Sequence, residues 1–338
     1  MNFKQVAIIG ADCISVSIAL RLKAQEEPPK IVGCDADIGM ANLARSKGAF
    51  DRVERKPGRT CRGADLVIVA EPLSIIRDVF ADMAPHLQPG CFVTDTARLK
   101  APVMRWAEEL VPENVFFVGG HPIPNPAIVG SRSLKGLEAA SADLLRGALY
   151  CLTTPARTSS TVIDTFTGLI KALEAYPFFI DVTEHDGLQA GVEGLSDLLA
   201  VALLRATVDT PGWQEMRKFA GYRFAAATAA ADRADEHHLA VFLNREHLLR
   251  RLDVLLGELV RLRDLLTQEN AETLEETFVT AAEGRARWIG ERERGMWVEE
   301  HTTGMEHVPG AGERIRQMVF GGYTTSRLKD RAGRSRKK

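Results

Sequence analysis

The sequence is poor in cysteine, and its cysteines stand far apart. Its 338 residues contain five, Cys13, Cys34, Cys61, Cys91 and Cys151, which fall mostly within apolar runs. A disulfide framework or a zinc site would need cysteines in pairs at short spacing. We therefore expect reduced, buried thiols, no metal site and a cytoplasmic location.

Long apolar runs and an excess of positive charge are also missing. No apolar run reaches the roughly 18 residues of a membrane span, and a strand signal by about residue 5 leaves no room for a signal peptide. The formal net charge is -2, whereas general nucleic-acid binders carry a basic excess. These absences predict a protein that binds neither membrane nor nucleic acid.

The first half of the chain alternates short apolar runs with amphipathic stretches, which is typical of a parallel sheet covered by helices. Strands are predicted at residues 5–10, 30–35, 64–72, 91–95 and 115–120. Helices are predicted at residues 13–25, 40–48, 74–87 and 102–110. This order predicts an α/β fold, a Rossmann-type doubly wound parallel sheet over residues 1–155, with its ligand at the carboxyl ends of the strands.

After about residue 160 the strand signals stop, and successive helical patterns predict an all-α domain over residues 156–290. Its longest predicted helix, 237–266, carries a leucine-rich stripe from Leu239 to Leu266. Such a stripe offers more apolar face than one neighbour covers, so we expect it to build both a core and a homodimer interface. Residues 291–338 lack periodicity and end in the basic run SRLKDRAGRSRKK, which predicts an extended or disordered tail.

The turn after the first predicted strand, GADCIS at residues 10–15, is the candidate cofactor site. In a dinucleotide-binding turn, three glycines permit the bend, the approach of the pyrophosphate and the packing of helix on strand. Gly10 suits the first role and Ser15 is a small substitute in the third, but Asp12 stands in the second. We take Gly10, Asp12, Cys13 and Ile14 as candidate cofactor contacts.

Asp12 is difficult to reconcile with a bound pyrophosphate. A carboxylate about 4 Å from a phosphate charge costs on the order of 4 kcal/mol at an effective dielectric constant of 20. Rotation to solvent, a metal ion shared with the phosphates, or capping of the following helix would each relieve this cost. A cap across the pyrophosphate site would argue against dehydrogenase chemistry, whereas an outward rotamer would leave it in place.

Asp35 ends the second predicted strand, 25 residues after Gly10. An acid at this place in a βαβ unit hydrogen-bonds the adenosine ribose and favours NAD over NADP. A cap for the next helix is the alternative interpretation. We keep Asp35 as a candidate cofactor contact and expect NAD as the cofactor.

A series of motifs follows in order from about residue 5 to about residue 289. The series is VAIIGADCISVSIALRL, VGCDAD, GADLVIVAEPLSII, PHLQPGCFVTDTARLKAPV, FVGGHPIP, DLLRGALYCLTTP and TEHDGLQAGVEGLSDLLAVAL. It resembles the prephenate and arogenate dehydrogenases, NAD(P)-dependent enzymes of tyrosine biosynthesis. The resemblance implies a Rossmann domain, a helical dimerisation domain and the oxidative decarboxylation of a small anionic cyclic substrate.

The resemblance also assigns candidate catalytic residues. His121 in GGHPIP matches the histidine that polarises or deprotonates the substrate hydroxyl, a role that suits an imidazole; a loop histidine bonded to backbone is the alternative. Arg98 in DTARLK replaces the family's assisting serine, where it would pair with a substrate carboxylate or fill the pocket. Lys218 falls on or near the arginine that grips the substrate carboxylate.

Other positions depart from the family pattern. Glu71, followed by Pro72, ends the strand that faces the nicotinamide, where an apolar residue is usual, and we keep both as candidate cofactor contacts. In the helical domain Gly194 replaces a substrate-binding histidine, while Glu193 and Asp197 add negative charge.

Four further polar residues have structural explanations. His185 and Asp186 match the family, but their place at a helix start favours a structural role. His237 and His238 also stand at a helix start, where we expect them to be solvated or to cap the helix.

Three functions stay open. The first is a divergent NAD-dependent dehydrogenase acting on prephenate, arogenate or a related cyclic carboxylate. The second is an enzyme of the same fold with changed chemistry, in which Arg98 and Lys218 bind an anion and His121 is the acid–base group. The third is a non-catalytic dimeric binding or regulatory protein with a degenerate cofactor site.

Overall fold

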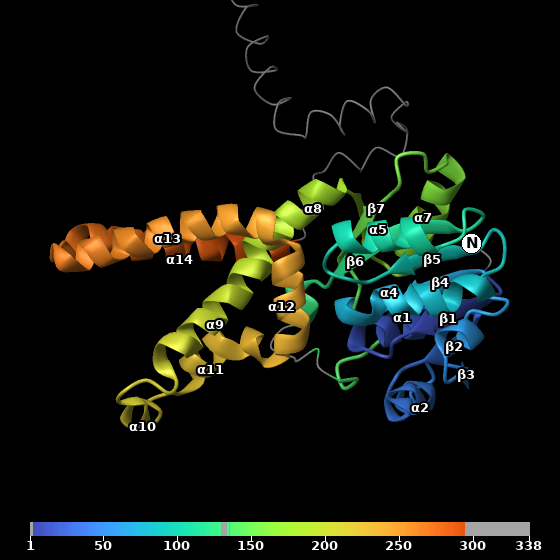
Figure 1. Ribbon diagram of the computed structural model, residues 1–338, viewed down its shortest axis with the longest axis horizontal. Helices are drawn as coiled ribbons and strands as arrows, with labels where there is room; N and C mark the ends of the chain where they lie inside the picture. Colours follow the sequence, from blue (N-terminus) through green and yellow to red (C-terminus); the bar gives the residue numbers. More distant parts are fainter. Residues whose placement is uncertain (1–2, 130–133, 135, 295–338) are drawn as a thin grey trace, which may run out of the picture. The chain divides into compact units, whose positions relative to one another are not determined.

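The structure of the chain, a computed structural model, describes residues 3–129, 134 and 136–294. Within these residues eight strands form one sheet in the order β3-β2-β1-β4-β5-β6-β7-β8 (Figure 1). The strands are β1 (Gln5–Ile9), β2 (Lys30–Cys34), β3 (Arg52–Val53), β4 (Leu66–Val69), β5 (Phe92–Asp95), β6 (Phe116–Ile123), β7 (Leu149–Thr153) and β8 (Tyr176–Phe179). Strands β6 and β7 are antiparallel and the other pairs are parallel. The order from β3 to β6 is that of a dinucleotide-binding fold, so the predicted fold class is confirmed.

Helices cover both faces of this sheet because successive side chains of the central strands point to opposite faces. Val6 and Ile8 of β1 belong to one buried cluster, and Ala7 and Ile9 belong to another. The helices of this part are α1 (Cys13–Lys23), α2 (Ile38–Ser46), α3 (Pro57–Thr60), α4 (Leu73–Met83), η1 (Ala84–His86), α5 (Ala101–Leu110), α6 (Pro126–Val129) and α7 (Ser160–Ala172). The core clusters therefore fix the carboxyl ends of β1, β2, β4, β5 and β6 along one edge.

The five predicted strands are all present, but three further strands were not predicted. Among them, β8 lies beyond the predicted domain boundary at residue 155 and pairs with β7, so the expectation of no strand after residue 160 is wrong. Its sequence YPFF contains Pro177, and three of its four residues are exposed. β8 is an edge strand of the sheet, where proline is tolerated. Its side chains do not alternate between buried and exposed positions. Because of Pro177 and this exposure, the sequence pattern of β8 does not indicate a strand.

The helical part begins with one continuous helix composed of α8 (Val182–Gln189), η2 (Ala190–Gly194) and α9 (Leu195–Thr207). It continues with α10 (Trp213–Met216), α11 (Tyr222–Thr228), η3 (Ala229–Arg233), α12 (Ala234–Leu243), α13 (Arg245–Thr267) and α14 (Ala271–Glu293). The single helix predicted over 237–266 is interrupted at Asn244, whose Nδ2 donates to the Asp186 carbonyl oxygen at 2.8 Å. Helix α14 reaches Glu293 and so overlaps the predicted tail, whose remainder from residue 295 lies outside the described residues.

Contrary to the expectation from the sequence, the stretch Val182–Thr207 is long and apolar enough to cross a membrane by length and composition. It also carries three buried polar residues, His185, Asp186 and Asp197. Asp186 accepts hydrogen bonds from backbone N–H groups at the start of α5, and Asp197 pairs with Arg98. These contacts make the stretch a wall of the candidate active site.

Candidate active site

The turn after β1 has the geometry of the first glycine in a dinucleotide-binding turn. Gly10 has a φ of +96°, and a Cβ there would lie 2.1 Å from the Ala70 carbonyl oxygen. Only glycine fits both this backbone conformation and this close approach to the end of β4. The structure therefore places Gly10 in the role predicted for it.

Asp12 caps helix α1. Its Oδ1 accepts the N–H of Ser15 at 2.7 Å, and its own N–H donates to Ser15 Oγ at 3.0 Å, a reciprocal capping box. Ser15 Oγ also donates to the Gly10 carbonyl oxygen at 2.8 Å, which ties the turn to the helix. The capping arrangement is thus the one that the chain adopts, and a negative charge lies at the positive end of α1.

Two more acids join Asp12 at this edge. Asp35 Oδ2 accepts the N–H of Ala11 at 2.7 Å, and its Oδ1 accepts the N–H of Asp37 at 2.7 Å. Burial, together with the negative charges of Asp35 and Asp12, raises the pKa of Glu71 from 4.5 to about 7. The predicted cofactor contacts are therefore gathered at one edge, where their net charge depends on pH near neutrality.

A buried ion pair supports the carboxyl ends of β5 and β6. Lys100 Nζ donates to Asp95 Oδ2 and to the Gly120 carbonyl oxygen, both at 2.5 Å, and neither Lys100 nor Asp95 is exposed to solvent. Asp95 Oδ1 accepts the N–H of Gly120 at 3.0 Å. A Cβ at Gly120 would lie 2.5 Å from the Asp95 carbonyl oxygen. The residue before His121 must therefore be small for the pair to fix this strand end.

His121 follows on β6 and is the first member of a hydrogen-bonded series. Its Nδ1 lies 3.0 Å from His185 Nε2 on α8, and His185 Nδ1 lies 2.8 Å from Asp186 Oδ1. Asp186 in turn accepts the N–H groups of Lys100 and Ala101, each at 2.9 Å. The structural role expected for His185 and Asp186 is therefore only part of what they do, because they also orient His121.

The series favours a proton on Nδ1 of His121. An ionised Asp186 only accepts, so His185 Nδ1 donates to it and the Nε2 of neutral His185 accepts from His121 Nδ1–H. This leaves a lone pair on His121 Nε2. Burial, and after it the nearby positive charges of Lys100 and Arg98, hold the pKa of His121 well below its ordinary value of 6.5. The ring is consequently a neutral proton acceptor at neutral pH.

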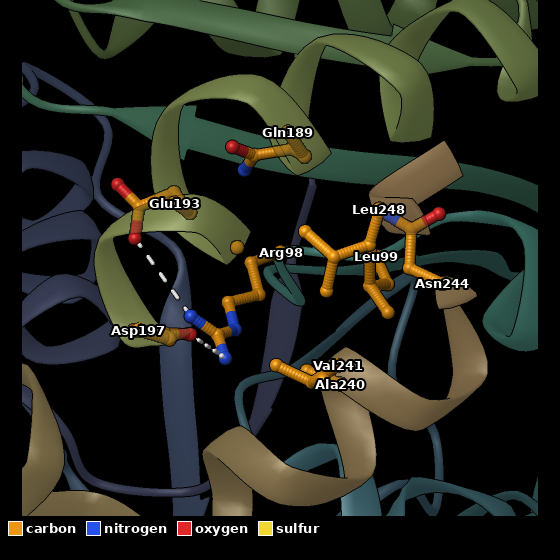
Figure 2. Close-up of a pocket in the computed structure, with 10 residues that line it drawn as sticks. Arg98, Leu99, Gln189, Glu193, Asp197, Ala240, Val241, Asn244 and Leu248 are labelled. Carbon is orange, nitrogen blue, oxygen red and sulfur yellow. Dashed lines mark hydrogen bonds and ion pairs between the residues drawn. The ribbon is translucent and has the colours of Figure 1, made fainter. Parts of the chain in front are cut away.

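A pocket lined by Arg98, Gln189, Glu193 and Asp197 adjoins this histidine. Figure 2 shows Arg98 pointing between the two acids: its Nη2 lies 2.9 Å from Asp197 Oδ2 and its Nη1 lies 3.8 Å from Glu193 Oε2. Gln189 Nε2 is 3.3 Å from His121 Nε2, which connects the pocket to the catalytic candidate.

The structure brings His121 and Arg98 to one site but does not bring Lys218 there. Lys218 follows α10, is exposed and has its Nζ 2.6 Å from Glu215 Oε2. Asp197, the partner of Arg98, lies at the start of α9, and the helix extends about 15 Å from it before the chain reaches α10. Within one chain, Lys218 is therefore not part of the pocket, and a catalytic role for it stays a prediction.

His237 is not the solvated residue that the sequence predicts. Its Nδ1 lies 3.0 Å from Asp197 Oδ1, and its side chain is largely buried. Asp197 thus stands between His237 and Arg98. His238 is exposed, as expected.

The sequence reasoning missed Gln189, Asn244 and Cys151. Cys151 is the cross-strand partner of His121 in the β6–β7 pair. The expectation of no metal site came from spacing along the chain, whereas the potential ligand atoms of His121, Cys151 and His185 lie within 4.8 Å of one another. The sequence signal for Cys151 was the apolar run LYCLT, which is compatible with a strand. Its pairing with the strand that carries His121 is seen only in the structure.

The family model for the nucleotide-binding domain of prephenate dehydrogenase matches residues 18–176. The match begins after the GADCIS turn and covers the strands from β2 to β7, together with Asp35, Glu71, Arg98 and His121. The turn with Asp12 and Ser15 lies outside the matched residues.

Curated relatives match along most of the chain. The chain is 26% identical over 283 residues to prephenate dehydrogenase of Bacillus subtilis, covering 83% of this chain and 75% of the relative. It is 24% identical over 289 residues to cyclohexadienyl dehydrogenase of Zymomonas mobilis, covering 84% of this chain and 95% of the relative. The similarity therefore includes the helical part as well as the sheet.

Solved structures share the fold. Prephenate dehydrogenase from Aquifex aeolicus, in complex with hydroxyphenyl propionate and NAD+, superposes with a TM-score of 0.74 at 21% identity and covers 85% of this chain and 99% of that one. Arogenate dehydrogenase from Synechocystis gives a TM-score of 0.65 at 19% identity, covering 84% and 99%. The matched nucleotide-binding domain and the curated relatives agree: residues 18–176 match the nucleotide-binding domain of prephenate dehydrogenase, and most of the chain is similar to prephenate and cyclohexadienyl dehydrogenases.

Proposed function

We propose that the protein catalyses the NAD-dependent oxidative decarboxylation of prephenate, arogenate or a related cyclic carboxylate in the cytoplasm. The observation that carries the proposal is the series His121–His185–Asp186, which presents a neutral imidazole at the same sheet edge as the cofactor turn. In this reaction a hydride leaves the ring carbon that bears the hydroxyl, the hydroxyl proton is lost, and CO₂ departs as the ring becomes aromatic. A proton acceptor beside that hydroxyl is the main requirement on the protein.

The residues of the turn fit a dinucleotide, but Asp12 competes with the pyrophosphate for N–H groups at the start of α1. Asp12 and Asp35 already occupy the N–H groups of Ser15 and Ala11. The N–H groups of Cys13 and Ile14 belong to the first turn of α1, where a helix supplies no acceptor of its own. We assign the pyrophosphate to these two N–H groups and the adenosine ribose to Asp35, which favours NAD over NADP. When bound, NAD+ supplies the hydride acceptor.

His121 performs the proton transfer in this proposal. Its Nε2 accepts the proton of the substrate hydroxyl while its Nδ1–H stays bonded to His185. The positive charge that forms on His121 is stabilised through His185 by the carboxylate of Asp186. Lys100 and Asp95 hold the backbone of Gly120, so the ring approaches the substrate from a fixed strand end.

Arg98 is the substrate-binding cation in this proposal. Asp197 holds one side of the guanidinium at 2.9 Å, while Glu193 lies at 3.8 Å on the other side and is largely exposed. A substrate carboxylate would form a shorter, charge-assisted pair with the second side of the guanidinium than Glu193 does. Arg98 thus supplies a site for the anionic substrate at the pocket next to His121.

One observation favours the non-catalytic alternative. Asp12 caps α1 where a pyrophosphate would gain from the same positive helix end, and Asp35 and Glu71 add further negative charge. The two functions differ in a simple measurement. A dehydrogenase binds NAD+ and reduces it in the presence of prephenate or arogenate, whereas the alternative shows no reduction with either substrate.

The deciding experiment follows the absorbance of NADH or NADPH with each combination of cofactor and substrate. We expect reduction of NAD+ with prephenate or arogenate and a lower kcat/KM with NADP+. Calorimetric titration with both cofactors accompanies the assay. Absence of binding and of turnover for every combination would overturn the proposal, and binding without turnover would favour an enzyme of changed substrate.

The charge of Glu71 predicts pH-dependent cofactor affinity. Below its pKa of about 7 the group is neutral, and above it a third negative charge joins Asp12 and Asp35, so NAD+ binding weakens as pH rises. Glu71→Gln is expected to tighten NAD+ binding at pH 8 by about tenfold, the effect of one charge at roughly 12 Å and an effective dielectric constant of 20. At pH 6 little change is expected.

Calorimetric titrations at the two pH values measure this effect. Glu109→Gln is the matched control, because Glu109 is an exposed acid on α5 away from the turn. Equal NAD+ affinity of wild type and Glu71→Gln at pH 8 would show that Glu71 does not face the cofactor.

We also propose a homodimer formed through the helical domain. The stripe on α12 and α13 leaves large apolar side chains exposed, among them Phe242, Leu249 and Leu266, each at least 58% exposed. A second copy would cover this surface. Sedimentation equilibrium of the full chain is expected to give twice the 37.1 kDa chain mass, and a monomer mass at micromolar concentration would contradict the proposal.

A further inference from the structure

We propose that His121, His185 and Cys151 form a binding site for a borderline-soft divalent cation such as Zn²⁺. The site goes beyond the proposed function, since dehydrogenase chemistry uses only the two histidines and does not require the cysteine. Bound Zn²⁺ would occupy His121 and so inhibit the enzyme.

Three different elements bring these side chains together. His121 on β6 and Cys151 on β7 are directly opposite in the antiparallel pair, so their side chains lie on the same face. Helix α8 places His185 beside them, with His185 Nε2 3.0 Å from His121 Nδ1. The three potential ligand atoms lie within 4.8 Å of one another, and His185 and Cys151 are at most 4% exposed.

Nitrogen and sulfur are the ligand atoms that Zn²⁺ prefers, with bonds of about 2.0–2.1 Å to nitrogen and about 2.3 Å to sulfur. In tetrahedral geometry these lengths separate the ligand atoms by about 3.3–3.6 Å. The two imidazole nitrogens, 3.0 Å apart, need to separate by a few tenths of an ångström, and a pair at the 4.8 Å limit needs to close by about 1.2 Å to reach this spacing. The cation replaces the proton that the two rings share.

The surroundings of His185 already resemble those of a metal ligand. Its Nδ1 is bonded to Asp186, and Asp186 is held by the N–H groups of Lys100 and Ala101. Such a carboxylate–histidine arrangement fixes the ring and increases the basicity of the other nitrogen. The two nearby cations do not oppose binding with their full charge, because Lys100 is paired with Asp95 and Arg98 with Asp197.

Cys151 must lose its proton to bind the cation. Binding therefore releases a proton from the thiol.

Titration of the metal-free, full-length protein with Co²⁺ and Zn²⁺ tests the proposal. Co²⁺ bound to thiolate produces a charge-transfer band in the near ultraviolet, and this reports binding whether or not the protein is an active dehydrogenase. We expect one Co²⁺ per chain with this band, and displacement by Zn²⁺. Absence of the band from the wild type would overturn the proposal.

Variants identify the ligands. Cys151→Ser is expected to abolish the band and weaken Zn²⁺ binding at least tenfold, whereas Cys91→Ser, at an equally buried cysteine before β5, leaves both unchanged. Circular dichroism verifies that each variant is folded. If Cys151→Ser does not fold, His185→Gln takes its place, with an expected tenfold loss of Zn²⁺ affinity. Wild-type affinity in a folded variant of either kind would contradict the assignment.

Discussion

His121→Asn is expected to lower kcat by about 10²- to 10⁴-fold, the usual contribution of a positioned acid–base group, while the affinity for NAD+ changes little. Asparagine fills a similar space but does not accept a proton in the reaction. The neutral state of His121, which burial and the nearby charges of Lys100 and Arg98 favour, is the state that the reaction requires. Initial rates of NADH formation and calorimetric titration of NAD+ measure the two quantities separately.

The matched control for this variant is His86→Asn. His86 follows α4 in η1, at the opposite edge of the sheet from the carboxyl ends of the strands, and should retain wild-type kcat. If His121→Asn kept more than about a third of the wild-type kcat, far less loss than a general base accounts for, His121 would have no part in proton transfer.

The sheet domain was predictable because its signals are local. Each of the strands β1, β2, β4 and β5 is an apolar run that ends at a turn, and the helix after each has its own apolar face. The role of Gly10 was also local, since one residue after the first strand must permit a left-handed bend. Patterns of this kind depend only on neighbouring residues, and the structure agrees with them.

The orientation of His121 was not predictable for the opposite reason. His121 and His185 are 64 residues apart, and their contact requires both the β6 position and the packing of α8 beside it. The position of His185 at the start of a helix predicted a structural role. That prediction took into account only the helix in which His185 lies. The contact of His185 Nε2 depends on β6, the strand that supplies its partner His121.

The break at Asn244 has a similar cause. The apolar spacing on either side is compatible with one long helix, and asparagine alone does not end a helix. Here the Asn244 amide is buried and donates to the Asp186 carbonyl oxygen. Asn244 and Asp186 are 58 residues apart in the sequence. A tertiary contact, and not the local pattern, therefore determines where α12 ends and α13 begins.

Asp12 illustrates the limit of a local argument about charge. The sequence allowed three arrangements, and the capping box with Ser15 selects one of them. Because the cap occupies the N–H of Ser15, we expect cofactor binding to depend on the remaining N–H groups of the first turn and on the charge of Glu71. The departure from the family's glycine turn therefore alters the expected affinity and pH dependence of binding, while His121 and its partners stay in place.

Lys100→Met is expected to lower the free energy of unfolding by about 3–5 kcal/mol, because it leaves the fully buried Asp95 without its cation. The Gly120 carbonyl oxygen also loses its donor. Desolvation lowers the pKa of Lys100 but the carboxylate of Asp95 opposes this, so each member of the pair depends on the other for its charge. Denaturant unfolding followed by circular dichroism measures the loss.

Two further variants separate the buried pair from a general effect of removing charge. Arg77→Met breaks an exposed pair with Glu109 and should cost at most about 1 kcal/mol. The double variant Lys100→Met with Asp95→Leu removes both charges and should recover much of the stability lost in Lys100→Met, since an apolar pair of similar volume is often neutral in a core. A loss below about 1 kcal/mol in Lys100→Met, no larger than that of a surface pair, would mean that the Lys100–Asp95 pair adds little to the stability of the fold. The pair would then not be the electrostatic support of the strand end that carries His121.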